Sequence, residues 1–323
     1  MFPESSSFIS WHTRQGVVTI EFCAILFTFK CSKMRIRNLM TTGLVCMALA
    51  GFGTVSCSDD NDNGDNGGSG SVENVNPDKV FPAGVPAVVF GNSVTKDALG
   101  RVTSIGDIAS FDYAPAKVRS SESDMTMTYY DGERYTIYIN LNEKGFVRHA
   151  EAYCDHEPYM EWDINYDKQN QVSYVRMYEY EEDSLEEISF KYSNGGLDKY
   201  TGKGKVSGRS VTGSCEVSYT DDDYPEGIAN KDRYIMWYDG IGGFDFDVLQ
   251  IAYYAGLLGV GPEKLPLKLV QEQKAGKETY RGVEAYSWRL DSNGYPASVT
   301  TEYKDYYNGS LEESGSDSTH FSW

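Results

Sequence analysis

The feature that most constrains the fold of this chain is a short turn cluster that recurs along it. The cluster reads NEKG at 142–145, DKQN at 167–170, SNGG at 193–196 and DSNG at 291–294, with an earlier copy, KDALG, at 96–100. Each copy ends on glycine or asparagine, which readily adopt the positive φ that closes a β-hairpin. The copies at 142–145, 167–170 and 193–196 follow one another at 25 and 26 residues, a spacing that fits two strands with their turns. The clusters therefore predict a series of repeated hairpins.

The segments between the turns alternate apolar and polar residues with a period of two, as strands with one buried face do. Clear cases are YTIYI at 135–139, ISFKY at 188–192 and YSWRL at 286–290, and the chain contains 25 tyrosines. The pattern predicts a single β-rich domain over 81–323. We expect a mainly β fold, an antiparallel meander or a barrel-like curved sheet of repeated hairpins.

One segment, near 246–258, breaks the strand pattern and predicts a helix. Asp245 or Asp247 can cap its start, and GVGP at 259–262 is expected to end it. Apolar residues surround almost its whole circumference, and a helix of that kind is buried. It is too short to span a membrane. We expect it to plug the inside or the mouth of the curved sheet; the alternative is that it lines a ligand cavity.

The chain begins with two segments that differ from the β domain. Residues 34–56 have the pattern of a signal peptide, with Arg35 and Arg37 before an apolar run too short for a permanent membrane helix. Residues 1–33 precede this complete signal. We therefore interpret Met34 as the true start and 1–33 as a misassigned upstream extension, with a second membrane segment as the alternative.

The end of the signal, TVSC at 54–57, resembles a bacterial lipobox, in which the cysteine becomes the first mature residue and carries the lipid. The acidic run at 58–62 resembles the export signal of Bacteroidetes surface lipoproteins. These resemblances imply a palmitate-type anchor on Cys57 and a place on the outer membrane facing the cell exterior; its periplasmic face is the alternative. The polar residues over 57–80 bury too little surface to fold, so we expect the acylated cysteine to continue into a disordered acidic tether.

Composition excludes some partners. The formal net charge is −19, so the phosphates of nucleic acids would be repelled and no nucleic-acid partner is expected. Of the six cysteines, only Cys154 and Cys215 lie in the β domain. They could form a disulfide in an oxidising compartment or remain two buried thiols, and the sequence leaves both open, as it does the oligomeric state.

Three patterns resemble catalytic or ligand-binding motifs, but none is specific. The glycine-rich loop at 240–243 precedes a helix, as a phosphate loop does, yet matches no nucleotide-binding motif. Cys154 and His156 could share a strand face, but their surroundings are acidic, which disfavours a reactive thiolate. Acidic clusters such as 181–183 and 221–223 could supply paired glycosidase carboxylates, yet no pair stands out. We therefore expect no enzyme activity, no cofactor and no metal site.

Aromatic residues are the feature that points to a partner. Exposed rings stack on the apolar faces of sugars, so Trp162, Trp237 and Trp288 are candidate ligand-binding residues. The alternative is that they pack within the sheet.

The final segment at 319–323, THFSW, resembles the end of an integral outer-membrane barrel, but the strands carry charges on many faces.

One part of the chain resembles a known family. MWYDGIGGF at 236–244, the apolar helix after it and GPEKLP at 261–266 are similar to Bacteroidetes lipoproteins of unknown function with a porin-like β fold. The resemblance covers most of 81–323. It implies a barrel-like β body and a lipid anchor, and it brings no catalytic residues.

Together these features predict a cell-envelope protein attached to the membrane through the lipid on Cys57. Its expected role is the non-enzymatic binding of an environmental ligand such as a glycan, by analogy with surface lipoproteins that capture nutrients. A module that docks another envelope protein is the alternative. A glycan hydrolase and an integral outer-membrane barrel are less favoured.

Overall fold

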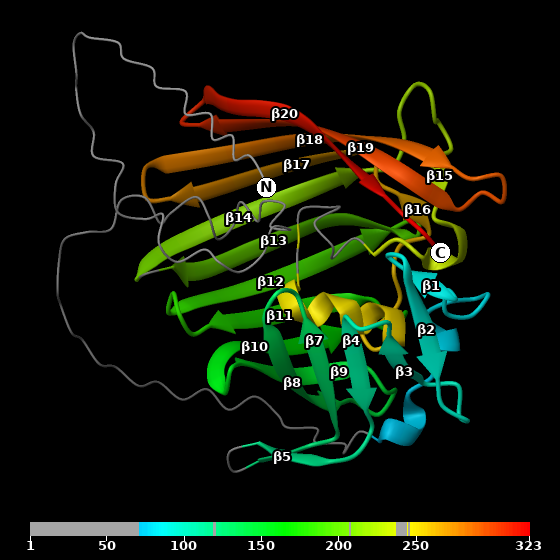
Figure 1. Ribbon diagram of the computed structural model, residues 1–323. Coiled ribbons are helices and arrows are strands. Elements are labelled where there is room, and N and C mark those ends of the chain that lie inside the picture. Colours follow the sequence, from blue (N-terminus) through cyan, green and yellow to red (C-terminus); the bar gives the residue numbers. More distant parts are fainter. Residues whose placement is uncertain (1–70, 119–120, 207, 237–243, 245) are drawn as a thin grey trace, which may run out of the picture.

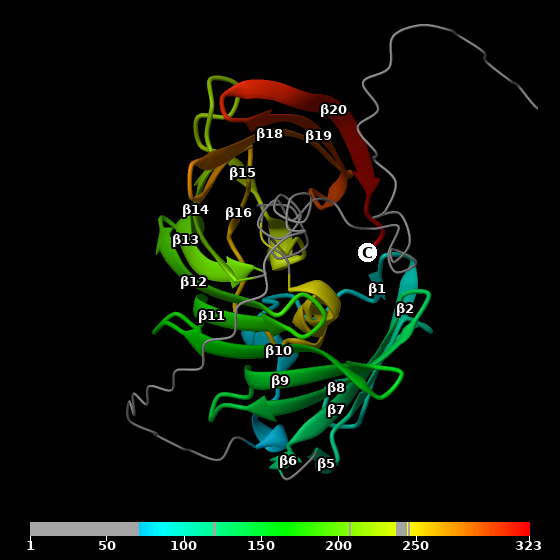
Figure 2. The same ribbon diagram turned by 90° about the vertical axis from the view of Figure 1, so that its left-hand side faces the viewer.

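The computed structural model describes residues 71–118, 121–206, 208–236, 244 and 246–323. Its main feature is a 16-stranded antiparallel sheet that runs in chain order from β1 (Val88–Val89) to β20 (Ser310–His320) (Figure 1). The sheet is strongly curved (Figure 2). Within the described residues no ladder joins β20 to β1, so the sheet is not closed. The predicted mainly β meander is therefore confirmed.

The strands lengthen toward the C-terminus. Between its two edges the main sheet contains β2 (Asn92–Lys96), β3 (Val102–Ile105), β4 (Ala109–Asp112), β7 (Met125–Tyr130), β8 (Arg134–Leu141), β9 (Val147–Cys154), β10 (Glu157–Tyr166), β11 (Val172–Glu179), β12 (Ser184–Ser193), β13 (Gly196–Val206), β14 (Arg209–Ser218), β17 (Lys268–Ala275), β18 (Glu278–Leu290) and β19 (Pro296–Tyr307). Two small sheets pair β5 (Ala116–Val118) with β6 (Ser121–Ser123) and β15 (Ile228–Ala229) with β16 (Lys264–Leu265). The helical elements are 3-10 segments: η2 (Val72–Asn74), η3 (Pro77–Lys79), η4 (Lys231–Arg233) and η5 (Asp247–Ala255).

The recurring turn cluster adopts one geometry. In the β10–β11 turn, Asp167 Oδ1 accepts hydrogen bonds from the backbone N–H groups of Gln169 and Gln171, both at 2.9 Å, and Asn170 has a φ of 64°. The turns after β2, β8 and β18 repeat both bonds, with Asp97, Asn142 and Asp291 as acceptors. An Asp or Asn side chain thus satisfies two turn amides. Because the meander alternates direction, all these turns lie on one side of the sheet, where the strands end. We name this row of turns the Asx edge; it is distinct from the edge strands β1 and β20.

The long connection between β14 and β17 starts at the Asx edge and forms η5 on the concave side of the sheet (Figure 2). Nearly every side chain of η5 is buried, which confirms the predicted buried helix near 246–258. Backbone hydrogen bonds from Val260 N to Asn170 O and from Glu263 N to Gly195 O, both 2.8 Å, attach the connection to the turns of the Asx edge. The plug is therefore held by the same turns that define the hairpins.

The ends of η5 differ from the prediction. The helix ends at Gly256, whose φ of 75° reverses the chain before 259–262 is reached. No side chain caps its start, because Asp247 Oδ2 instead accepts a hydrogen bond from the Tyr159 hydroxyl at 2.9 Å. Asp245, the other predicted cap, lies outside the described residues. No helix among the described residues is both long and apolar enough to cross a membrane.

The two faces of the sheet separate by polarity, as the period-two pattern predicts. On β8, Tyr135, Ile137 and Ile139 are buried on the concave face, where they pack with the plug in one core. Their neighbours Arg134 and Tyr138 point outward. The concave face of the sheet therefore carries the main apolar core, and the outward face carries the polar groups.

Residues 71–80 correct the expected extent of the tether. They form η2 and η3 and bury Val75, Pro77 and Val80 instead of remaining disordered. The Asn74 carboxamide donates to Glu143 O at 3.0 Å, which fixes this segment to a turn of the Asx edge. Three apolar side chains among polar ones are enough here, because the sheet edge supplies a surface that covers them.

Candidate functional site

An open groove lies on the outward face of the sheet, at the edge opposite to the Asx edge. Its volume is about 460 Å³, which falls within the range of about 300–1,000 Å³ typical of small-molecule sites. Side chains from β5, β8, β9 and the β9–β10 turn line it: Lys117, Arg134, Thr136, Tyr138, Tyr153, Asp155 and His156. We take this groove as the candidate functional site.

The sheet forms one wall of the groove. Thr136 of β8 pairs with Tyr153 of β9, and Arg134 and Tyr138 lie two residues to either side of Thr136 on the same face. The rings of Tyr138 and Tyr153 meet edge to face with centroids 5.8 Å apart. The Tyr153 hydroxyl donates to Glu151 Oε2 at 2.8 Å, which fixes the orientation of its ring. This wall therefore presents two aromatic rings, Tyr138 and Tyr153, in a fixed orientation.

The β5–β6 hairpin forms the other wall and contributes Lys117. This hairpin makes its own two-stranded sheet, so its position depends on bonds to β8. The Asn140 carboxamide donates to Glu122 O at 2.9 Å, and the Leu141 N–H donates to Asp124 Oδ2 at 2.7 Å. These two bonds attach the hairpin to β8, so that Lys117 lines the groove opposite to the wall that the sheet forms.

The tight turn between β9 and β10 supplies Asp155 and His156. Their φ values are 47° and 72°, and two positive φ values in succession define a hairpin turn that Asn-Gly adopts with least strain. A residue with a Cβ loses roughly 1 kcal/mol or more in this region. The turn therefore holds a carboxylate and an imidazole at the groove at some cost to stability.

Positive charge gathers in the groove although the whole chain carries a net charge of −19. Arg101, Arg176 and Arg233 elsewhere pair with carboxylates at 2.7–3.1 Å. Among the described residues, by contrast, neither Arg134 nor Lys117 forms an ion pair or a side-chain hydrogen bond. The groove thus offers cationic N–H donors that the protein itself leaves unused.

A strip of charged residues adjoins the groove on the outward face. His149, Glu161 and Asp163 place potential metal-ligand atoms within 4.8 Å of one another. His149 Nδ1 lies 2.8 Å from Asp163 Oδ1, and this hydrogen bond raises the pKa of His149. Arg176 Nη1 contacts both carboxylates, at 3.1 Å from Asp163 and 3.6 Å from Glu161. Because Arg176 already forms ion pairs with Glu161 and Asp163, we interpret the strip as a row of ion pairs across neighbouring strands that stabilises the sheet.

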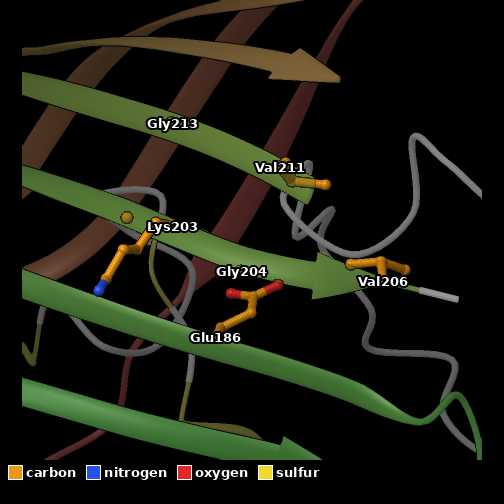
Figure 3. Close-up of a pocket in the computed structure, with 7 residues that line it drawn as sticks. Glu186, Lys203, Gly204, Val206, Val211 and Gly213 are labelled. Atoms are coloured by element: carbon orange, nitrogen blue, oxygen red, sulfur yellow. The ribbon is translucent and has the colours of Figure 1, made fainter. Parts of the chain in front are cut away.

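A second hollow lies on the concave face, where Glu186 of β12 is paired with Gly204 of β13 (Figure 3). Its volume of about 10 Å³ leaves room for one water at most. Burial, together with the nearby charge of Glu182, raises the pKa of Glu186 to about 7. A Cβ on Gly204 would lie 2.5 Å from Leu185 O, so only glycine allows this close approach. We name this hollow the inner pocket.

The two predicted site residues that the structure describes, Trp162 and Trp288, do not line the groove. Trp162 was expected to be exposed, and that expectation is wrong: its side chain is 0% exposed, because its strand position places it on the concave face. Trp288 is half-buried, and its indole N–H donates to Pro266 O at 2.7 Å. Trp237 and the predicted lipidation site Cys57 lie outside the described residues.

The two cysteines of the β domain lie apart in the part of the chain that the structure describes. No disulfide joins Cys154 to Cys215 there. The Cys154 thiol donates to Glu133 Oε2 at 3.2 Å, and burial raises the pKa of the Cys215 thiol well above its usual value. The glycines at 240–243 lie outside the described residues.

The groove could not be predicted as a unit because its lining comes from three parts of the chain. One signal was present: in RYTIY at 134–138 the outward positions hold a cation, Arg134, and an aromatic ring, Tyr138. The contribution of Lys117 had no signal, because nothing local shows that the β5–β6 hairpin returns to β8.

Comparison with known proteins yields a distant structural likeness. No protein-family model and no curated protein matches the chain. Among solved structures, it is similar to a porin-like protein from Bacteroides uniformis, at 14% sequence identity and a TM-score of 0.45. The alignment covers 72% of this chain and 88% of that one. A likeness this distant supports no inference about function.

Proposed function

We propose that this protein is a non-enzymatic binding module of the cell envelope that holds an environmental glycan in the outward groove. The observation that carries the proposal is one groove of about 460 Å³ that combines a tyrosine pair with Arg134 and Lys117. Aromatic faces pack against the C–H groups of a sugar ring. Arginine and lysine N–H groups donate hydrogen bonds to sugar oxygens.

The proposal includes a lipid anchor on Cys57 and a place on the outer membrane facing the exterior. Support for the anchor comes from the lipobox-like residues at 54–57 and the acidic run after them. The outward face of the sheet carries charged side chains such as Asp163 and Arg176, which suit contact with water rather than lipid. A groove on that face would be accessible to ligands outside the cell.

Binding without catalysis is favoured by the composition of the groove. Glycosidases use two carboxyl groups, about 5–10 Å apart, that flank the scissile bond. The groove lining contains a single carboxylate, Asp155. A ligand held there would meet donors and aromatic rings but no second carboxylate among the described lining residues.

A glycan array probed with the full-length chain tests the proposal, followed by titration with the best ligand. The variant Tyr138→Ala removes half of the aromatic pair and should weaken binding up to about tenfold, since an aromatic ring contact contributes roughly 0.5–1.5 kcal/mol. Tyr224→Ala is the matched control, because Tyr224 is 45% exposed and lies in the loop that follows β14. An array with no hits, or a Tyr138→Ala variant that binds as tightly as the wild type, would overturn the proposal.

A further inference from the structure

We propose that the groove selects glycans that carry a carboxylate, such as uronic acid units, over their neutral counterparts. This inference rests on the proposed function and adds the chemical class of the ligand. It derives from the two unpaired cations of the groove, their placement on opposite walls, and the acidic residues that surround them.

Arg134 and Lys117 are the groups that recognise the carboxylate. They extend from different elements, β8 and β5, into the same groove. Guanidinium offers two parallel N–H groups that match the two oxygens of a carboxylate, and ammonium adds a further donor. A neutral sugar brings no counter-charge to either cation. A carboxylate in the groove would pair with Arg134, and Lys117 would add positive charge from the other wall.

The acidic neighbours of the groove set the orientation of such a ligand. Glu151 pairs across the sheet with Tyr138 on one side and with Glu161 on the other. Both glutamates therefore lie on the outward face beyond the tyrosines. They would repel a carboxylate at that end. Asp155 is the one carboxylate of the described groove lining and faces the same groove as Arg134, so the two parallel N–H groups of Arg134, rather than repulsion alone, place the ligand's carboxylate at the Arg134 end. The sugar rings then lie over Tyr138 and Tyr153.

The overall charge makes the selection local rather than general. A chain with a net charge of −19 repels anionic glycans at long range. Only a groove with paired donors can offset that repulsion at contact. The resulting attraction is between exposed charges, so added salt should weaken it.

The test compares matched pairs of oligosaccharides by calorimetric titration of the full-length chain. Each pair consists of a uronic acid oligosaccharide and its methyl ester, which keeps the ring shape and removes the charge. We expect the acid to bind about tenfold more tightly than the ester at low salt, a gap that shrinks in 0.5 M NaCl.

Arg134→Gln should reduce the acid-to-ester preference to less than about threefold. Arg289→Gln is the matched control, because Arg289 is exposed and lies at the end of β18 near the Asx edge; it should leave the preference unchanged. Thermal melting of both variants confirms that the fold is intact.

The outcomes separate the two proposals. If esters bind as tightly as acids across all pairs, or if Arg134→Gln keeps the full preference, the acid selection is wrong while glycan binding stands. If neither acid nor ester binds and the array shows no hits, the proposed function itself is overturned.

Discussion

The outward groove and the inner pocket place charged side chains in opposite settings. The groove is large and open, and its lining includes Lys117 and Arg134, which form no ion pair within the described residues. The inner pocket has room for one water at most. The carboxyl group of Glu186 is almost fully buried there, beside Gly204 of β13. A perturbed pKa by itself would point to the inner pocket as the functional site. Volume and unused donors point to the groove, and they decide the matter because a ligand must first fit.

Mutations in the inner pocket and mutations in the groove should affect different properties of the protein. Changes at the inner pocket should alter the free energy of unfolding and leave ligand binding intact. Changes at the groove should do the reverse, because its side chains are exposed and contribute little to the core. Four predictions sharpen this contrast, from the largest expected effect to the smallest.

Gly204→Val should have the largest effect. Its Cβ would lie 2.5 Å from Leu185 O, a backbone atom that cannot move without disrupting the pairing of β12 with β13. We expect a loss of about 3 kcal/mol in the free energy of unfolding, measured by urea denaturation. Groove ligands should still bind below the melting temperature. A loss under 0.5 kcal/mol would show, roughly, that the inner pocket is not tightly packed.

Glu186→Gln should remove a pH dependence. Burial raises the pKa of Glu186 from 4.5 to about 7, so the charged form is disfavoured in the fold. The stability linked to the neutral form is complete below pH 4.5 and is lost as the pH rises through 7. At pH 8 the variant should therefore be more stable than the wild type by about 2–3 kcal/mol, and at pH 4 nearly equal. Melting curves at both pH values check this, and parallel curves would contradict it.

Asp167→Ala tests the Asx edge, which lies away from both hollows. The variant loses the two hydrogen bonds from Gln169 and Gln171, so we expect a loss of about 1–1.5 kcal/mol. Asp167→Asn keeps the acceptor and should retain most of the stability. Binding to the groove should be unchanged in both, and a binding defect would mean that the plug and the groove are coupled.

His156→Gly should slightly increase the stability of the fold and slightly weaken ligand binding. The φ of 72° at this position favours glycine, so the variant should gain about 1 kcal/mol of stability. It should also lose affinity for the groove ligand, because a donor that lines the groove is removed. Denaturation and titration of the same sample measure both. A stabilised variant with full affinity would remove His156 from the binding surface.

Local signals in the sequence were enough to predict the hairpins. Asp97, Asp167 and Asp291 each lie at the start of a turn whose hydrogen bonds stay within five residues. The SNGG copy also forms a turn, although by another geometry, in which Asn194 and Gly195 both have positive φ. Such contacts need no knowledge of the rest of the fold, so a single sequence reveals them.

Features that depend on distant contacts were not predictable. Trp162 looked available for a ligand, but its face of β10 was set by the curvature of the whole sheet. The helix η5 was recognised by its apolar surface, yet its end at Gly256 was not, because GVGP at 259–262 offered a stronger local stop. The groove required the β5–β6 hairpin, which forms its own separate sheet, to bring Lys117 to the groove that Arg134 also lines.

The most direct test of the account is to locate a bound glycan in a crystal of the full-length protein. An acidic oligosaccharide chosen from the array should lie in the groove, with its carboxylate within hydrogen-bond distance of Arg134 and its rings against Tyr138 and Tyr153. A ligand found instead on the concave side, with the groove empty, would contradict the central claim and move the binding site to the inner face of the sheet.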